Sequence, residues 1–208
     1  MRSAFAATGA FVLAISASPD AHRLDEYLQA ARVSFARTGL GVELDLTPGA
    51  TVADGVIALI DSDGDHRISP LEAESYGRVV LKDVILELDG RPVGMALVHA
   101  EVPPIEEMRQ GVGTIHLRAT GDVEGSIGRH QVHVRNSHQA SSSVYLVNAL
   151  VPDDADVHVV AQTRDARQQN VRIDYSVGPQ WPKHLYWPVL GAAALFLIVR
   201  RRTSTTNH

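Results

Sequence analysis

Oxygen-bearing groups recur on alternate positions of one twelve-residue segment, which runs from Asp61 to Glu72. Calcium is a hard cation that takes six to eight oxygen ligands at about 2.3–2.6 Å, and a loop of this length can surround it. Ile68 fills the apolar eighth position, which anchors such a loop to its neighbours. The predicted ligands, the arginine through its backbone carbonyl, are Asp61, Asp63, Asp65, Arg67, Ser69 and Glu72.

One residue of this segment departs from the EF-hand pattern that the spacing resembles. The sixth position of an EF-hand turns sharply and is expected to be glycine, whereas this sequence has His66. Histidine is among the side chains enriched at positive φ, where the strain costs about 1–2 kcal/mol. We expect calcium binding about tenfold weaker as a result. Because no second loop is present to pair with it, we expect a Kd of about 10⁻⁴–10⁻³ M.

An alternative without a metal is also open for the same segment. It would then be an acidic surface loop that caps the following helix, with Glu72 in the first helical turn, where a carboxylate is favoured. Four carboxylates within twelve residues would repel one another in that arrangement. Magnesium is a less suitable ion than calcium, because it demands tighter octahedral geometry.

Short helices are predicted on both sides of the loop. Val52–Ile60 is apolar enough for two or three turns, with Thr51 as its expected N-cap. Pro70–Val84 has apolar residues at nearly helical spacing and begins with a proline, which the first turn tolerates. Together these segments predict a helix–loop–helix EF-hand over residues 52–84.

The remaining sequence alternates between apolar and polar residues with the period of strands. A hairpin is expected first, with its turn at Arg37–Gly39, and Asp89-Gly90 predicts a second turn that joins Ile85–Leu88 to a partner strand at Val93–Val102. Ile105–Gln110 predicts a short helix. The fold class is therefore mainly β, an antiparallel sandwich-like domain with one inserted helix–loop–helix. The other expected strands are Tyr27–Phe35, Val42–Leu46, Thr114–Ala119, His130–Arg135, Val144–Leu150, Val157–Gln162 and Val171–Val177.

Both ends of the chain predict export and anchoring. Residues 1–21 carry Arg2 followed by an apolar and small-residue stretch, which is typical of a signal peptide. Residues 185–199 are apolar, have Trp181, Tyr186 and Trp187 just before or at their start and precede three arginines, which predicts a transmembrane anchor with a cytoplasmic tail at 200–208. The domain at 22–180 would then be extracytoplasmic, in the periplasm.

Composition narrows the partners of this domain. A net charge of −5 and a pI near 6.0 give no basic surface for nucleic acid. The chain has no cysteine, which excludes disulfides and thiolate metal sites. No esterase, metalloprotease or phosphate-binding motif is present, so we do not expect an enzyme, although a hydrolase assembled from distant residues is a second alternative.

The histidines of this chain suggest transition-metal binding as the main alternative to calcium binding. If cleavage follows Ala21, the amine and imidazole of His22 could chelate copper or nickel, as in an accessory to nickel, cobalt or copper uptake. We expect His130, His133 and His138 to be ordinary surface or turn residues, with the first two on opposite faces of a strand. The acidic run of Asp153, Asp154 and Asp156 is expected to be a solvated turn.

Three further stretches resemble a known group: Ala21–Gln29, Glu43–Gly49 and Val144–Leu150. With the loop, they are similar to bacterial exported proteins that contain an embedded EF-hand. They also resemble the extracytoplasmic N-terminal domain of HupE/UreJ-like and nickel/cobalt permeases. The resemblance implies an exported domain over residues 21–178. This chain has one candidate span without intramembrane histidine or carboxylate, so it departs from a permease and would at most assist one.

The sequence therefore predicts a calcium-binding, membrane-anchored extracytoplasmic module. Its expected partners are a calcium ion, the membrane and an unidentified protein.

Overall fold

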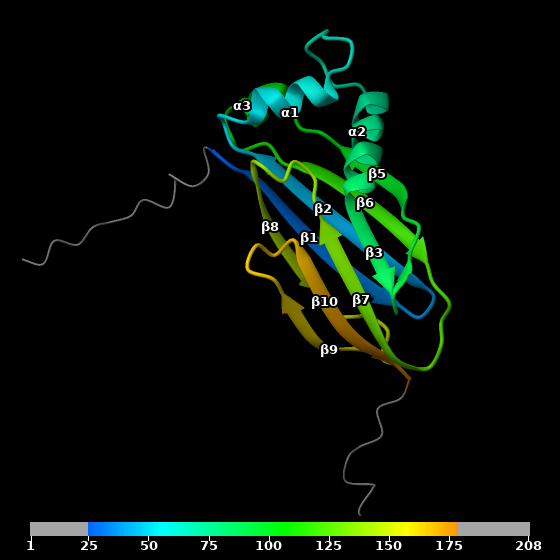
Figure 1. Ribbon diagram of the computed structural model, residues 1–208. Coiled ribbons are helices and arrows are strands. Elements are labelled where there is room, and N and C mark those ends of the chain that lie inside the picture. The colour runs from blue at the N-terminus through cyan, green and yellow to red at the C-terminus, as the bar shows by residue number, and fades with distance from the viewer. Residues whose placement is uncertain (1–24, 179–208) are drawn as a thin grey trace, which may run out of the picture.

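The computed structural model describes residues 25–178, which form two packed β-sheets with three helices at one end (Figure 1). The predicted signal peptide, His22, the predicted anchor at 185–199 and the tail at 200–208 lie outside the described residues. Within the described part, no helix combines the length and the apolar composition that crossing a membrane would require. The expected β-rich class is confirmed.

The element bounds follow the predicted periodicity closely. The strands are β1 (Tyr27–Ala36), β2 (Gly39–Pro48), β3 (Val84–Leu88), β4 (Arg91–Pro92), β5 (Ala96–Glu101), β6 (Ile115–Asp122), β7 (Gly128–Asn136), β8 (Ser143–Ala149), β9 (Val157–Arg164) and β10 (Asn170–Val177). The helices are α1 (Ala53–Ile60), α2 (Pro70–Asp83) and α3 (Ile105–Arg109).

The first sheet has the strand order β5-β6-β2-β1-β8. The β1–β2 hairpin is antiparallel, as predicted, but β8 lies beside β1 in parallel, with Tyr27 opposite Ser143. The expectation of a purely antiparallel sandwich is therefore wrong at this edge. The reason is the connection between the sheets. After β7 the chain crosses from the second sheet to the first, and β8 then runs in the same direction as β1, because no hairpin joins these two strands.

The second sheet has the order β4-β3-β7-β10-β9 and is antiparallel throughout. Asp89 and Gly90 both have positive φ, at 51° and 78°, which is the geometry of a tight hairpin turn. The predicted partner strand at Val93–Val102 is wrong. Arg91 and Pro92 pair with β3, and the N–H of Val93 still donates to the carbonyl of Leu86 at 2.8 Å before the strands separate. The chain then crosses to the first sheet as β5.

Alternate strand residues meet between the two sheets and form the core. In β1 and β2 every second side chain is buried, which is the period-two pattern seen in the sequence. The core of the second sheet is formed mainly by Val132, Val134, Val171, Ile173 and Tyr175.

The helical insertion follows β2 and precedes β3, so the loop between α1 and α2 lies at one end of the sandwich (Figure 1). Val52 is the N-cap of α1 and makes no side-chain cap bond, so the prediction of Thr51 as N-cap is wrong. The Thr51 hydroxyl instead donates to Asp25 at 3.3 Å. Gly77 brings α2 close to β5, because a Cβ added there would lie 2.9 Å from a terminal methyl carbon of Leu97, which would have to shift. The insertion is thus packed on the first sheet.

Candidate metal centre

Asp61 is the C-cap residue of α1 and the first residue of the acidic loop. Its backbone N–H donates to the carbonyl of Ile57 at 2.8 Å, which closes the last turn of the helix. Its side chain is only 5% exposed although it carries a carboxylate. A helix C-terminus carries partial negative charge, and α1 has no basic residue in its last turn to offset it. A cation at this position would therefore be stabilised.

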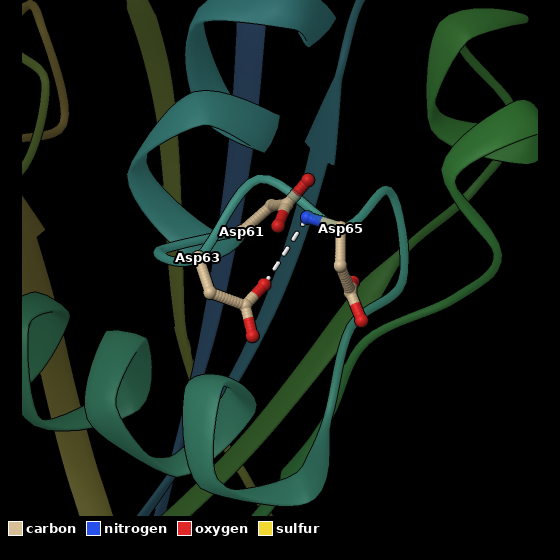
Figure 2. A group of neighbouring side chains, drawn as sticks. All are labelled: Asp61, Asp63 and Asp65. Carbon is tan, nitrogen blue, oxygen red and sulfur yellow. Dashed lines mark hydrogen bonds between the residues drawn. The ribbon is translucent and has the colours of Figure 1, made fainter.

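Three of the predicted ligands lie together. Asp61, Asp63 and Asp65 each offer a carboxylate oxygen, and these oxygens lie within 4.8 Å of one another (Figure 2). Two oxygens on opposite sides of one calcium ion are at most about 5 Å apart, given calcium–oxygen distances of about 2.3–2.6 Å. The three carboxylates therefore have the spacing of ligands that share a single ion.

The Asp61 carboxylate also shapes the loop. One oxygen accepts from the backbone N–H of Gly64 at 2.9 Å, and the other accepts from that of His66 at 3.1 Å. These bonds bring the backbone back toward the end of α1. His66 has a φ of 62°, which is the positive value expected at the sixth position, and its imidazole is 80% exposed.

The next two aspartates turn the backbone in the same way. Asp63 accepts from the N–H of Asp65 at 3.1 Å (Figure 2). Asp65 accepts from the N–H of Arg67 at 2.8 Å. Both bonds use Oδ1 of the aspartate. They turn the backbone between the aspartates, and the carboxylates of Asp63 and Asp65 lie close to that of Asp61. Ile68 is half-buried and packs against the core, so the apolar eighth position attaches the loop to the domain as expected.

Glu72, the predicted twelfth-position ligand, does not belong to this group of oxygens. It accepts from the backbone N–H and the hydroxyl of Ser69, both at 2.9 Å, while the Ser69 hydroxyl accepts from the N–H of Glu72 at 3.3 Å. This reciprocal pair is a capping box that starts α2. The alternative role foreseen for Glu72, capping the helix, is therefore present in the structure.

The second carboxylate oxygen of Glu72 reaches back to the start of the loop. It accepts from the N–H of Ser62 at 2.7 Å and from the Ser62 hydroxyl at 3.0 Å. Hydrogen bonds from Ser69, first from its backbone and then from its side chain, and from Ser62 lower the pKa of Glu72 to about 2. Ser62 is a residue that sequence reasoning missed, because the second position of the loop carries no ligand.

These bonds bear directly on whether Glu72 can also hold a metal. Each carboxylate oxygen has two lone pairs, and each accepts here from one backbone N–H and one hydroxyl. The two N–H bonds leave one lone pair on each oxygen. Rotation of the Ser62 and Ser69 hydroxyls would free those lone pairs for bidentate coordination.

A second cluster, distinct from the acidic loop, is buried in the core. The Tyr27 and Tyr76 hydroxyls are 2.7 Å apart, and Tyr76 lies 3.1 Å from Nε2 of His138. The other ring nitrogen of His138 is 2.8 Å from the carboxylate of Asp83, the last residue of α2. His138 lies in a turn, as one part of its prediction has it, but it is 1% exposed, so the expectation of a surface position is wrong.

This Asp–His–Tyr chain bears on the hydrolase alternative. An aspartate, a histidine and a hydroxyl in series have the order of a nucleophilic triad. The Tyr76 hydroxyl, however, lies in the core on a side chain that is 2% exposed, and burial raises its pKa to about 12. The cluster therefore holds α2 to the sandwich and offers no accessible nucleophile.

The remaining predicted features lie outside the main core, although the side chain of His130 is only 11% exposed and is therefore not the surface residue that was expected. His130 and His133 lie on opposite faces of β7, as expected, and each pairs with a carboxylate from β3 or the β3–β4 turn. The acidic run after Pro152 is a turn in which Asp154 and Asp156 both bind Arg37. Within residues 25–178, the aspartate trio is the sole group of three or more potential metal-ligating side chains that converge, and it contains no histidine.

Comparison with protein-family models gives no match for this chain, and comparison with curated proteins gives none either.

Proposed function

We propose that the domain is a calcium-binding module, held outside the cytoplasmic membrane, in which one ion binds at the loop from Asp61 to Glu72. The convergence of three aspartate carboxylates within 4.8 Å at the C-terminus of α1 supports this proposal most strongly. The carboxylates of Asp61, Asp63 and Asp65 would hold the ion. The Arg67 carbonyl, Ser69 and Glu72 would complete its oxygen shell.

The ion would have a structural consequence at the start of α2. Glu72 lies outside the aspartate group, so its binding to the same ion would draw the first turn of α2 toward Asp61. The backbone N–H groups of Ser62 and Ser69 would continue to orient its carboxylate. Calcium would then link the two helices of the insertion, which pack on each other, with α2 also packed on β5 of the first sheet.

Stabilisation by the ion follows from mass action. A ligand that binds only the folded state adds RT ln(1 + [L]/Kd), or about 1.4 kcal/mol at a tenfold excess. For a domain of this size, that corresponds to a rise in melting temperature of about 3–6 °C. Extracytoplasmic calcium would therefore act as a stabilising cofactor, and the folded module would be available to a protein partner at the membrane surface.

Calorimetric titration of the full chain with calcium, magnesium, nickel and copper tests the proposal. We expect one calcium site with a Kd of about 10⁻⁴–10⁻³ M and weaker magnesium binding. Asp63→Asn should abolish the calcium heat, and Asp153→Asn, which changes an exposed aspartate outside the loop, should not. Heat from nickel or copper without any from calcium would contradict the proposal and favour the metal-uptake alternative.

Anchoring is tested separately by fractionation of cells. The full chain should sediment with membranes, and a chain that ends at residue 184 should be recovered in the periplasmic fraction. Recovery of both chains in the same soluble fraction would contradict the proposed anchor without affecting the calcium site.

A further inference from the structure

A cavity of about 500 Å³ lies at one edge of the sandwich, where the two sheets separate. One wall is the β3–β4 turn of the second sheet with the start of β4, including Asp89 of the turn and Arg91 of β4. The opposite wall is the end of β6 and the connection from β6 to β7, including Glu124 and Ser126. His130 on β7 lies between these walls and lines the cavity with them. Its imidazole can therefore form hydrogen bonds with both walls of the cavity.

The imidazole of His130 has a hydrogen-bond acceptor at each ring nitrogen. Nδ1 is 2.8 Å from a carboxylate oxygen of Asp89, and Nε2 is 2.9 Å from the backbone carbonyl of Ser126. An ionised carboxylate and a carbonyl accept hydrogen bonds and donate none. Both nitrogens can satisfy these partners at once only if both carry a proton. The geometry is therefore that of an imidazolium ion.

We propose that His130 forms a pH-sensitive link between the β6–β7 connection and the β3–β4 turn. As an imidazolium ion it donates a hydrogen bond to each of them, and when it loses a proton it releases the β6–β7 connection. The proton leaves from Nε2, because the carboxylate of Asp89 is the stronger acceptor and keeps the proton on Nδ1. The lone pair of Nε2 then faces the carbonyl oxygen of Ser126. The hydrogen bond between His130 and the β6–β7 connection is lost, and the two lone pairs repel each other.

Charged and titratable groups from the neighbouring elements contact this ring or line the cavity with it. Asp89 holds it from the β3–β4 turn, with Arg91 of β4 nearby, and the ring of Tyr175 from β10 is 5.4 Å away. Asp122 and Glu124 face the same cavity from the end of β6. The group is thus surrounded by more negative than positive charge, which favours the protonated ring.

The direction of the titration agrees with the geometry. The hydrogen bond to Asp89 raises the pKa of His130, burial opposes that effect, and the bond to the Ser126 carbonyl adds to it. A histidine whose folded-state pKa is raised stabilises the closed form below its ordinary pKa. That stabilisation is lost as the pH rises through the raised pKa. Release is therefore expected on the alkaline side of the ordinary histidine range.

The Ser126 hydroxyl gives a variant that separates the two states. It lies 3.3 Å from Nε2 and, unlike the carbonyl, can donate to the deprotonated ring. Ser126→Ala keeps the backbone carbonyl that the imidazolium binds and removes the one group of Ser126 that can hold the neutral ring. We therefore expect this change to leave the connection closed at low pH and to increase its release at high pH.

Nuclear magnetic resonance of the full chain tests the pH-sensitive link at His130 with two observables. The ¹⁵N shifts of His130 should show two protonated nitrogens at pH 6 and a midpoint above about 6.5. The protection of the Ser126 amide, which donates to the carbonyl of Glu124 at 3.0 Å, should fall through the same midpoint after correction for its intrinsic exchange rate. By linkage, each unit by which the pKa differs between the closed and open connection should appear as a tenfold loss of protection.

Two variants complete the test. Asp89→Asn should move both midpoints to lower pH, and His130→Gln should remove the pH dependence of protection at the Ser126 amide. A neutral ring at pH 6, or protection that does not change across the titration of His130, would overturn the proposal. Persistence of the pH dependence in folded His130→Gln would overturn it equally.

Discussion

The backbone N–H of Ser62 donates a hydrogen bond of 2.7 Å to the carboxylate of Glu72, so the second residue of the acidic loop is held by its twelfth. The same carboxylate completes the capping box of α2 with Ser69. Glu72 therefore has a structural task of its own, separate from the three aspartates that converge at the end of α1. The two groups of carboxylates should respond differently to substitution.

Glu72→Gln should lower the melting temperature even in the presence of a calcium chelator. The amide keeps one acceptor oxygen, but its NH₂ group faces donors at Ser62 or Ser69, and the charge that favours the start of α2 is lost. Asp63→Asn should leave melting in chelator nearly unchanged, because Asp63 bonds only within the exposed turn. Thermal unfolding followed by circular dichroism measures both. Equal loss of stability in chelator for the two variants would contradict the division of roles.

His66→Gly should tighten calcium binding by up to about tenfold. His66 has a φ of 62°, a conformation that costs a non-glycine residue about 1–2 kcal/mol. His66→Ala retains a Cβ and should bind calcium no more tightly than the parent chain, which makes it the matched control. Calorimetric titration gives the three dissociation constants. A higher melting temperature for His66→Gly with an unchanged Kd would show that folding, rather than binding, bears the strain.

Tyr76→Phe should lower the free energy of unfolding by about 1–3 kcal/mol, because it leaves buried partners at Tyr27 and His138 without their shared hydroxyl. Tyr145→Phe removes a hydroxyl from the same region and should cost less. The carbonyl of His138 that Tyr145 contacts also accepts from Gln29 and Ser143. Urea unfolding of both variants measures the difference. A larger loss for Tyr145→Phe would contradict this account of the cluster.

Gln162 on β9 protects the edge of the opposite sheet. Its amide donates to the carbonyl of Val147 at 2.7 Å and accepts from the N–H of Ala149 at 3.1 Å, as a paired strand would. Gln162→Leu should leave these edge groups of β8 open, which favours pairing between molecules. We expect sedimentation velocity to show self-association of this variant. Gln131→Leu, which breaks an exposed bond to Asp174, should behave as the parent chain.

Local patterns in the sequence were enough to predict most of the strands and all three helices. Alternation in β1 and β2, the Asp89-Gly90 turn and the helical spacing after Pro70 each have a local cause. Pairing partners were less predictable, because the parallel contact of β1 with β8 depends on where a distant strand returns. The transfer of Ala96–Glu101 to the other sheet has no local signal either.

The same distinction holds for the candidate site. Spacing alone predicted that Asp61, Asp63 and Asp65 would lie together, since residues two apart in a tight loop face a common centre. It could not show that Glu72 is held by Ser62, or that His138 is buried, because both depend on contacts between distant residues. A histidine in a polar stretch is expected to be exposed unless its partners are known.

Thermal unfolding of the full chain in millimolar calcium and in chelator, with Asp63→Asn beside the parent, tests the central claim most directly. We expect calcium to raise the melting temperature of the parent by about 3–6 °C at a tenfold excess over Kd, and to leave that of Asp63→Asn unchanged. Identical melting of the parent chain in calcium and in chelator would contradict the claim that the loop from Asp61 to Glu72 binds the ion.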